Sequence, residues 1–185
     1  MVTTAVIILG VVVLLVIWAI SIYNGMVKSR NVVDQEWHNV DVQLERRYAL
    51  IPNLVETVKG YAKHESETLT KVTELRTQAM NATSMAERAE ANNMLTSALS
   101  GLKVQLEAYP ELKANTNFLQ LQEELASTEN KISFSRQLYN QVVTDYNNKI
   151  QIFPNNIMAG IFNFTAKELF ELSTAEARQA PKVSF

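Results

Sequence analysis

The stretch that decides the fold lies near the N-terminus and reads Ala5-Val-Ile-Ile-Leu-Gly-Val-Val-Val-Leu-Leu-Val-Ile-Trp-Ala-Ile-Ser-Ile-Tyr23. It carries no charged side chain, and the first charged residue of the chain is Lys28. Nineteen helical residues at about 1.5 Å each span about 29 Å, close to the roughly 30 Å hydrocarbon core of a bilayer. Unpaired backbone amides are costly in lipid, so even its β-branched valines favour a helix there. We therefore predict a transmembrane helix that spans about residues 4–23. Its expected membrane-anchor residues are Ala5, Leu9, Leu14, Trp18 and Tyr23.

A cleaved signal peptide is the alternative for this segment. A signal peptide has a positively charged start and an apolar core of about 7–15 residues. Here the start has no Lys or Arg, and the apolar run is longer. Lys28 and Arg30 follow the span, while no basic side chain precedes it. The positive-inside rule then predicts a short N-terminus outside and the remaining chain in the cytoplasm.

Composition limits the rest of the chain to a helical domain without nucleic-acid or thiol chemistry. Residues 1–27 form the expected anchor, which leaves about 158 of the 185 residues, enough for one core. Five Gly and four Pro are too few for the turns of an all-β protein, so we predict an all-α fold. The net charge of −2 provides no basic patch for nucleic acid. The absence of Cys excludes disulfides, thiolate catalysis and Cys-based metal sites.

Prolines divide this domain into long helical intervals. The expected helices cover about residues 4–48, 52–82, 84–109 and 116–152. The first would continue from the membrane into the domain, with Gly25 as the plausible hinge. Asn53 and Glu56 have the spacing of a capping box, and so do Ser84 and Glu87. The four helices predict an antiparallel, up-down, coiled-coil-like bundle over residues 28–153.

The fourth interval shows a heptad repeat of seam residues. The seam positions are 118, 121, 125, 128, 132, 135, 139, 142 and 146, which alternate steps of three and four. Glu129 and Arg136 flank the seam at matching heptad positions. A polar network between helices is one interpretation of this region, and ordinary heptad-flanking salt bridges are the other. The candidate network residues are Asn53, Glu56, Glu129, Asn130 and Arg136.

The chain changes character after Pro154. Residues 157–164 are apolar and interrupted by Gly160, and the chain ends on Phe185. We expect residues 154–185 to dock on the bundle or on a neighbouring subunit, with addition as a strand to a partner as the alternative. Thr165–Glu168 and Ser173–Glu176 each have the pattern of a short helix start. The candidate contact residues between copies are Ile157, Ile161, Phe162, Phe164 and Phe185.

The sequence holds few groups that could carry catalysis. His64 and Glu65, with Glu67, form the only His/carboxylate cluster of the sequence, and no second His lies four residues away to complete a helical metal site. His38 has Glu36 and Asp41 nearby, but it is distant from His64 in the sequence. No Gly-rich phosphate loop and no nucleophile beside a base occurs. We therefore predict no enzymatic activity, no metal and no cofactor.

Several motifs resemble the LemA family. They are the run Asp41–Glu65, the run Leu125–Ile132, Arg136, Tyr139-Asn140, Tyr146-Asn147, Phe153-Pro154 and the Ala-Arg-Gln-Ala-Pro-Lys-Val-Ser-Phe185 ending. The resemblance covers nearly the whole chain. It implies a bacterial, single-pass protein of the cytoplasmic membrane with an antiparallel four-helix domain in the cytoplasm. It assigns no catalytic residue, and it implies gene neighbours that include membrane metalloproteases.

These observations predict a membrane-anchored helical scaffold or assembly protein. Its expected partners are the lipid bilayer and further copies of itself in the membrane plane. The alternative is a regulatory adaptor of a membrane protease or of another membrane protein. A bundle that binds a lipid or small ligand is a third hypothesis.

Overall fold

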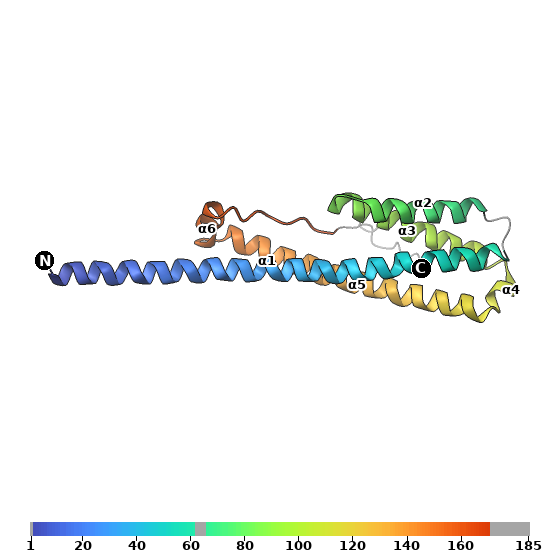
Figure 1. Cartoon of the computed structure of the whole chain (residues 1–185), viewed down its shortest axis with the longest axis horizontal. Coiled ribbons are helices and arrows are strands. Elements are labelled where there is room, and N and C mark those ends of the chain that lie inside the picture. Colours follow the sequence, from blue (N-terminus) through green and yellow to red (C-terminus); the bar gives the residue numbers. More distant parts are fainter. Residues whose placement is uncertain (1, 62–65, 171–185) are drawn as a thin grey trace, which may run out of the picture. The chain divides into compact units, whose positions relative to one another are not determined.

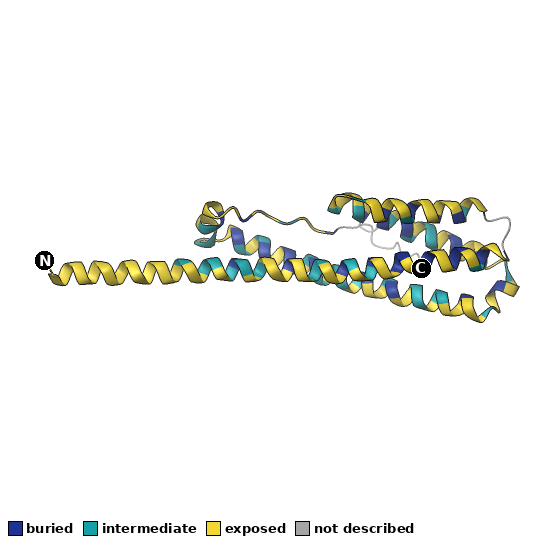
Figure 2. Cartoon of the chain, viewed as in Figure 1, coloured by how far each residue is buried: buried dark blue, intermediate teal, exposed yellow. Residues whose placement is uncertain are grey.

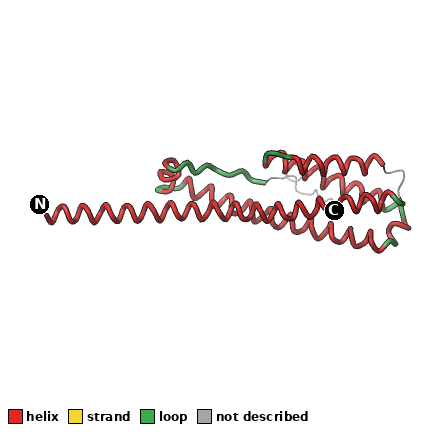
Figure 3. The backbone as a smooth tube through the Cα atoms, viewed as in Figure 1, coloured by secondary structure: helices red, strands yellow, loops and turns green. Residues whose placement is uncertain are grey.

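The computed structural model describes residues 2–61 and 66–170, and within these ranges the chain is helical with no strand (Figure 3). The helices are α1 (Val2–Lys59), α2 (Ser66–Asn81), α3 (Met85–Leu106), α4 (Pro110–Lys113), α5 (Thr116–Gln151) and α6 (Asn155–Ile161), as labelled in Figure 1. The all-α class is confirmed, and so is a long helix that begins with the apolar N-terminal run.

Helix α1 is longer than predicted, because Pro52 lies inside it rather than at a boundary. A proline in a helix interior costs about 3 kcal/mol and leaves the carbonyl four residues earlier without its N–H donor. Here the Nε of Arg76 donates to that carbonyl, Tyr48 O, at 2.7 Å. Burial of Ile51, Leu54 and other apolar residues of this segment, each worth about 1.5–3 kcal/mol, outweighs the remaining cost. The helix continues through Gly25 as well, and it ends next to Gly60.

The two expected capping boxes have different outcomes. At the start of α3, Ser84 Oγ accepts from Glu87 N at 3.1 Å and Glu87 Oε2 accepts from Ser84 N at 3.2 Å, so this box is confirmed. The box at Asn53 and Glu56 is wrong, because both residues lie within α1 and have no free helix start to cap.

The expected ends of the later helices shift by a few residues. Helix α3 ends at Leu106, before Pro110, which instead begins the short helix α4. Residues 165–168 are not helical, so the expected helix start there is wrong. The corresponding pattern at Ser173–Glu176 lies outside the described residues.

The heptad seam of α5 is confirmed by burial. All nine seam positions are buried or half-buried, and Phe118, Ile132 and Tyr146 are among the most enclosed side chains of the helix. The 3.5-residue repeat therefore marks the face that α5 turns to the protein interior.

The described chain divides into two compact units. The first unit holds residues 2–39 and 137–169, and the second holds residues 40–136 with Phe170. Buried residues of the first unit include Met26, Val33, Tyr139, Val143 and Tyr146. Buried residues of the second unit include Leu44, Leu75, Leu95, Leu102 and Phe118, which come from α1, α2, α3 and α5. The expected division into residues 1–27, 28–153 and 154–185 stays a prediction.

Candidate functional site

The apolar N-terminal part of α1 has no protein packed around it. Figure 2 shows this part as exposed along its length. Its most apolar 18-residue window has a mean hydropathy of 3.1, and none of it is buried. Of the described helices, α1 alone is long and apolar enough to cross a membrane. Among the expected anchor residues, Ala5, Leu9, Leu14 and Trp18 are exposed and Tyr23 is half-buried.

Tyr23 is half-buried because the segment after α5 folds back onto it within the first unit. Its ring lies 4.8 Å from the ring of Phe162 and 5.7 Å from that of Phe164, measured between centroids. Asn163, between them, has a φ of 54°, a left-handed conformation that Asn tolerates better than most residues. This turn ends α6 and directs both phenylalanines toward α1.

Two cations fix the same region. The guanidinium of Arg30 lies 5.2 Å from the centroid of the Phe164 ring, within range of a cation–π interaction. The Nζ of Lys149, near the end of α5, donates to Gly25 O at 2.8 Å. Helix α6 is therefore held beside the last turn of the apolar run by contacts of Lys149, which precedes it in the sequence, and of Phe164, which follows it.

The residues expected at a contact between copies lie in different environments. Ile157 and Ile161 are 54% and 63% exposed, and Phe162 is 50% exposed although it packs on Tyr23. Phe164 is buried. Phe185 lies outside the described residues.

The chain after Phe164 is held against α5 by three side chains of the first unit. Tyr146 Oη donates to Thr165 O at 3.0 Å, and Tyr139 Oη donates to Glu168 O at 2.9 Å. Asn147 both donates to Lys167 O and accepts from Lys167 N, each at 2.9 Å. These contacts satisfy the backbone of a segment that has no secondary structure of its own.

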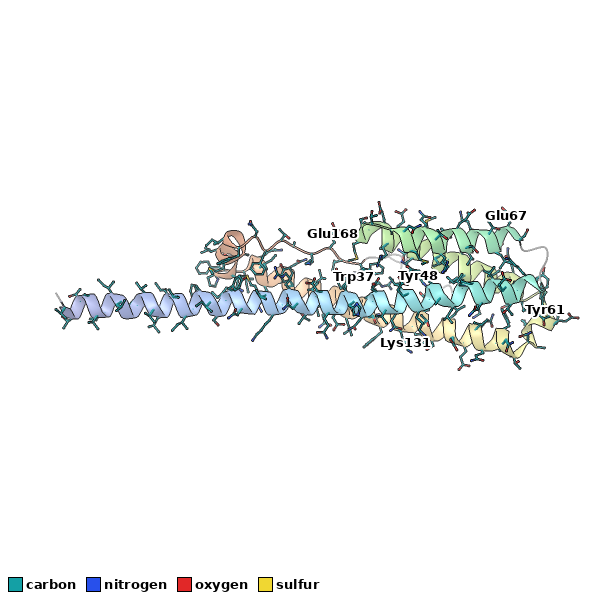
Figure 4. All side chains as sticks on the ribbon, viewed as in Figure 1. Trp37, Tyr48, Tyr61, Glu67, Lys131 and Glu168 are labelled. Carbon is teal, nitrogen blue, oxygen red and sulfur yellow. The ribbon has the colours of Figure 1, made fainter. Side chains whose placement is uncertain are left out.

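Tyr139 of α5 has a strongly raised pKa. Its ring lies 5.4 Å from that of Trp37, which Figure 4 labels together with Glu168. Burial, and secondarily the negative charges of Asp34 and Glu168, raise its pKa to about 12. Burial also raises the pKa of Tyr146. Both phenols are therefore protonated donors at neutral pH.

A polar network centred on Arg47 lies inside the second unit. Arg47 Nη1 donates to Glu129 Oε2 at 2.7 Å and to Thr96 Oγ1 at 2.8 Å. Arg47 Nη2 donates to Asn92 Oδ1, which also accepts from Tyr48 Oη at 3.0 Å. Residues of α1, α3 and α5 thus meet around one guanidinium, whose Nε is buried without a hydrogen-bond partner.

Sequence reasoning found one member of this network. Glu129 takes part, but Asn53, Glu56 and Asn130 are exposed, and Glu56 forms a surface ion pair with Lys59 at 3.1 Å. No hydrogen bond or ion pair joins Asn53 or Glu56 to Glu129 within the described ranges. Arg136 is half-buried, and burial lowers its pKa, while the nearby charge of Glu129 partly opposes that shift.

The members that sequence reasoning missed are Arg47, Tyr48, Asn92 and Thr96. A signal for Arg47 was present in the sequence. The apolar positions Val33, Val40 and Leu44 continue with the same spacing onto Arg47 and Tyr48, which places both on the buried face of α1.

This network joins three helices, because Arg47 of α1 bonds to Asn92 and Thr96 of α3 and to Glu129 of α5. The partners of its guanidinium are an amide, a hydroxyl and a carboxylate. No group of three His, Asp or Glu side chains suited to a metal ion occurs in the described part of the chain. His38 is exposed, and His64 lies outside the described residues. A groove of about 240 Å³ beside the network is lined by five leucines, among them Leu54, Leu102 and Leu106, and by polar residues that include Arg47, Thr96 and Glu129 of the network.

Comparison with known proteins gives one family. Residues 36–185 match the model of the LemA family. The chain is 27% identical over 164 residues to Protein LemA of Metamycoplasma hominis, an alignment that covers 84% of this chain and 75% of that protein.

Proposed function

The chain belongs to the LemA family, and from this premise we propose that it is a single-pass scaffold protein of the bacterial cytoplasmic membrane. The observation that carries the proposal is the exposed apolar run of α1, whose most apolar 18-residue window has a mean hydropathy of 3.1 and no buried residue. A soluble protein would leave this surface in contact with water, whereas a bilayer would cover it.

The energetics of insertion support the proposal. Residues 5–23 contain thirteen Val, Ile or Leu side chains. At about −0.3 to −0.6 kcal/mol each, they favour insertion by about 4–8 kcal/mol in total. Lys28 and Arg30, directly after the run, favour an orientation with the N-terminus outside and the rest of the chain in the cytoplasm.

The cytoplasmic part would serve as a helical platform. Within the second unit, Arg47 links α1 to α3 and α5, and Arg76 links α2 to α1. These links support an antiparallel, up-down four-helix arrangement of that unit. A platform without a reactive centre acts through what it holds in place, and we propose that it holds further copies of itself in the membrane plane.

We propose that the contact between copies lies on the exposed apolar run of α1. Phe164, one of the expected contact residues, is already buried inside its own chain next to Tyr23. The run of α1 offers an apolar helix surface of full span length, and helices in lipid associate through such surfaces by close packing.

Cross-linking tests the proposal, since the chain has no Cys of its own. A Leu14→Cys variant in native membranes should form disulfide-linked dimers under mild oxidation. Val104→Cys, which is 69% exposed on α3, is the matched control and should stay monomeric. A chain that is a monomer in mild detergent at every working concentration, with no cross-link at Leu14→Cys, would refute self-association. Recovery of a stoichiometric second protein in a pull-down would favour the adaptor alternative.

A further inference from the structure

Helix α6 and the residues before it present a dense group of exposed apolar side chains. We call this group the α6 apolar surface, and it consists of Ile152, Phe153, Ile157, Ile161 and Phe162, each at least half exposed. Single exposed apolar residues are ordinary, but five large ones within eleven residues mark a surface that something covers.

The position of this surface is fixed relative to the apolar run of α1. Phe162 packs on Tyr23, the last residue of that run, at 4.8 Å between ring centroids. Lys149 reaches the same turn of α1 through its bond to Gly25 O. All of these residues belong to the first unit, so the surface lies level with the end of the run.

The stretch of sequence that carries this surface and the stretch that leads out of the apolar run both hold cations and no anion. No Asp or Glu occurs before Asp34, and none occurs between residues 146 and 167. The cations near the surface are Lys28, Arg30 and Lys149, with Arg30 stacked on the neighbouring Phe164 ring. An apolar surface whose own stretch of sequence holds a cation and no anion complements the boundary between acyl chains and phosphate groups of a membrane.

We propose that the α6 apolar surface inserts into the bilayer beside the cytoplasmic end of the α1 span, as a second membrane contact of this chain. Interfacial helices of this kind bury their apolar face by about 5–10 Å. The inference rests on the proposed membrane anchor, because Tyr23 is level with the bilayer surface only if the run of α1 crosses it. The partner is lipid rather than a second copy, because Lys149 is the cation within the stretch that carries the surface, no Asp or Glu occurs there, and anionic phospholipid headgroups complement that charge.

Depth-dependent quenching in reconstituted full-length protein tests this. An environment-sensitive fluorophore is attached to single-Cys variants at three exposed positions, namely Ile161→Cys, Leu14→Cys and Val104→Cys. The vesicles contain anionic and zwitterionic phospholipids that carry a nitroxide either near the headgroup or near the end of the acyl chain. The label at Ile161→Cys should be quenched most by the shallow nitroxide, the label at Leu14→Cys by the deep one, and the label at Val104→Cys by neither.

A second pair of variants excludes insertion driven by the label itself. Ile157→Glu, added to labelled Ile161→Cys, places a charge on the apolar surface and should abolish the quenching. Asn156→Glu places the same charge on an exposed polar position of α6 and should preserve more of it. Equal quenching in both would overturn the proposal.

The remaining outcomes separate this inference from the proposed function. Quenching at Leu14→Cys without quenching at Ile161→Cys would overturn the α6 contact and leave the anchor standing. Absence of quenching in labelled Ile161→Cys, together with disulfide-linked dimers of the unlabelled variant under mild oxidation, would overturn the lipid contact in favour of a protein interface. Absence of quenching at both positions would overturn the anchor as well.

Discussion

Replacing Glu129 with leucine should destabilise the second unit by leaving the Arg47 cation without its counter-charge. The side chain of Arg47 is only 2% exposed, and its ion pair with Glu129 measures 2.7 Å. Removing one partner of a buried pair typically costs about 3–5 kcal/mol, because the other charge stays buried and uncompensated.

The structure places the expected loss near the lower end of this range. Glu129 is 42% exposed, so water can partly take its place, and Arg47 keeps its bonds to Thr96 and Asn92. We therefore expect Glu129→Leu to lower the free energy of unfolding by about 3 kcal/mol.

Removing Arg47 first should abolish most of that loss. Arg47→Met takes away the cation, and Asn92 keeps its hydrogen bonds to Tyr48 Oη and to Arg88 O. We expect Arg47→Met to cost about 1–2 kcal/mol. The double variant should then be about as stable as Arg47→Met alone, which gives a coupling energy of up to about 3 kcal/mol.

Urea unfolding of the full-length chain in mild detergent, followed by circular dichroism, measures these values. Glu123→Leu, at an exposed position of the same helix, is the control and should change stability by less than about 0.5 kcal/mol. If the losses of Glu129→Leu and Arg47→Met simply add in the double variant, the buried cation is not the cause and the reasoning is wrong.

Three further predictions follow from local contacts. Arg76→Met should lower the free energy of unfolding by about 1–3 kcal/mol, because it leaves Tyr48 O without a hydrogen-bond donor. In the Pro52→Ala background the loss should be smaller, since the alanine supplies a backbone N–H to that carbonyl. Equal losses in both backgrounds, measured by urea unfolding, would contradict this. Stability should fall as pH rises from 10 to about 12, because the folded chain keeps the Tyr139 proton up to about pH 12 while the unfolded chain releases it near pH 10. Tyr139→Phe should flatten this part of the pH profile, and an unchanged slope would count against the raised pKa. Ser84→Ala should cost about 1 kcal/mol in urea unfolding, and a variant as stable as the parent would show that the Ser84 hydroxyl does not stabilise α3. Hydrogen bonds from Thr83, and secondarily from the backbone of Ser84, lower the pKa of Glu87, so stability should decline as pH falls below the ordinary carboxyl pKa of 4.5.

Features that depend on neighbouring residues were predictable from the sequence. The apolar run of α1 and the seam of α5 are periodic patterns read along one helix, and the structure has both. The cap at Ser84 depends on a residue three positions away, and it too is present. In each case the physical cause is contained within a few turns of the chain.

Features that depend on distant residues were not predictable. The continuation of α1 through Pro52 needs a donor from Arg76 on another helix, 28 residues from the accepting carbonyl. The partner of Glu129 is Arg47, which is 82 positions away and resembles an ordinary surface residue unless the buried stripe of α1 is followed through it. The extended segment after Phe164 is likewise fixed by Asn147 of α5 and not by its own propensities. Hydrogen bonding between elements decided all three.

Membrane extraction of the full-length chain tests its anchorage most directly. Alkaline carbonate releases proteins that are only attached to a membrane surface and retains those with a helix in the bilayer. We predict that the full chain stays in the membrane fraction and that a variant lacking residues 2–23 is released. Release of the full chain, or retention of the shortened one, would contradict a single anchoring span in α1.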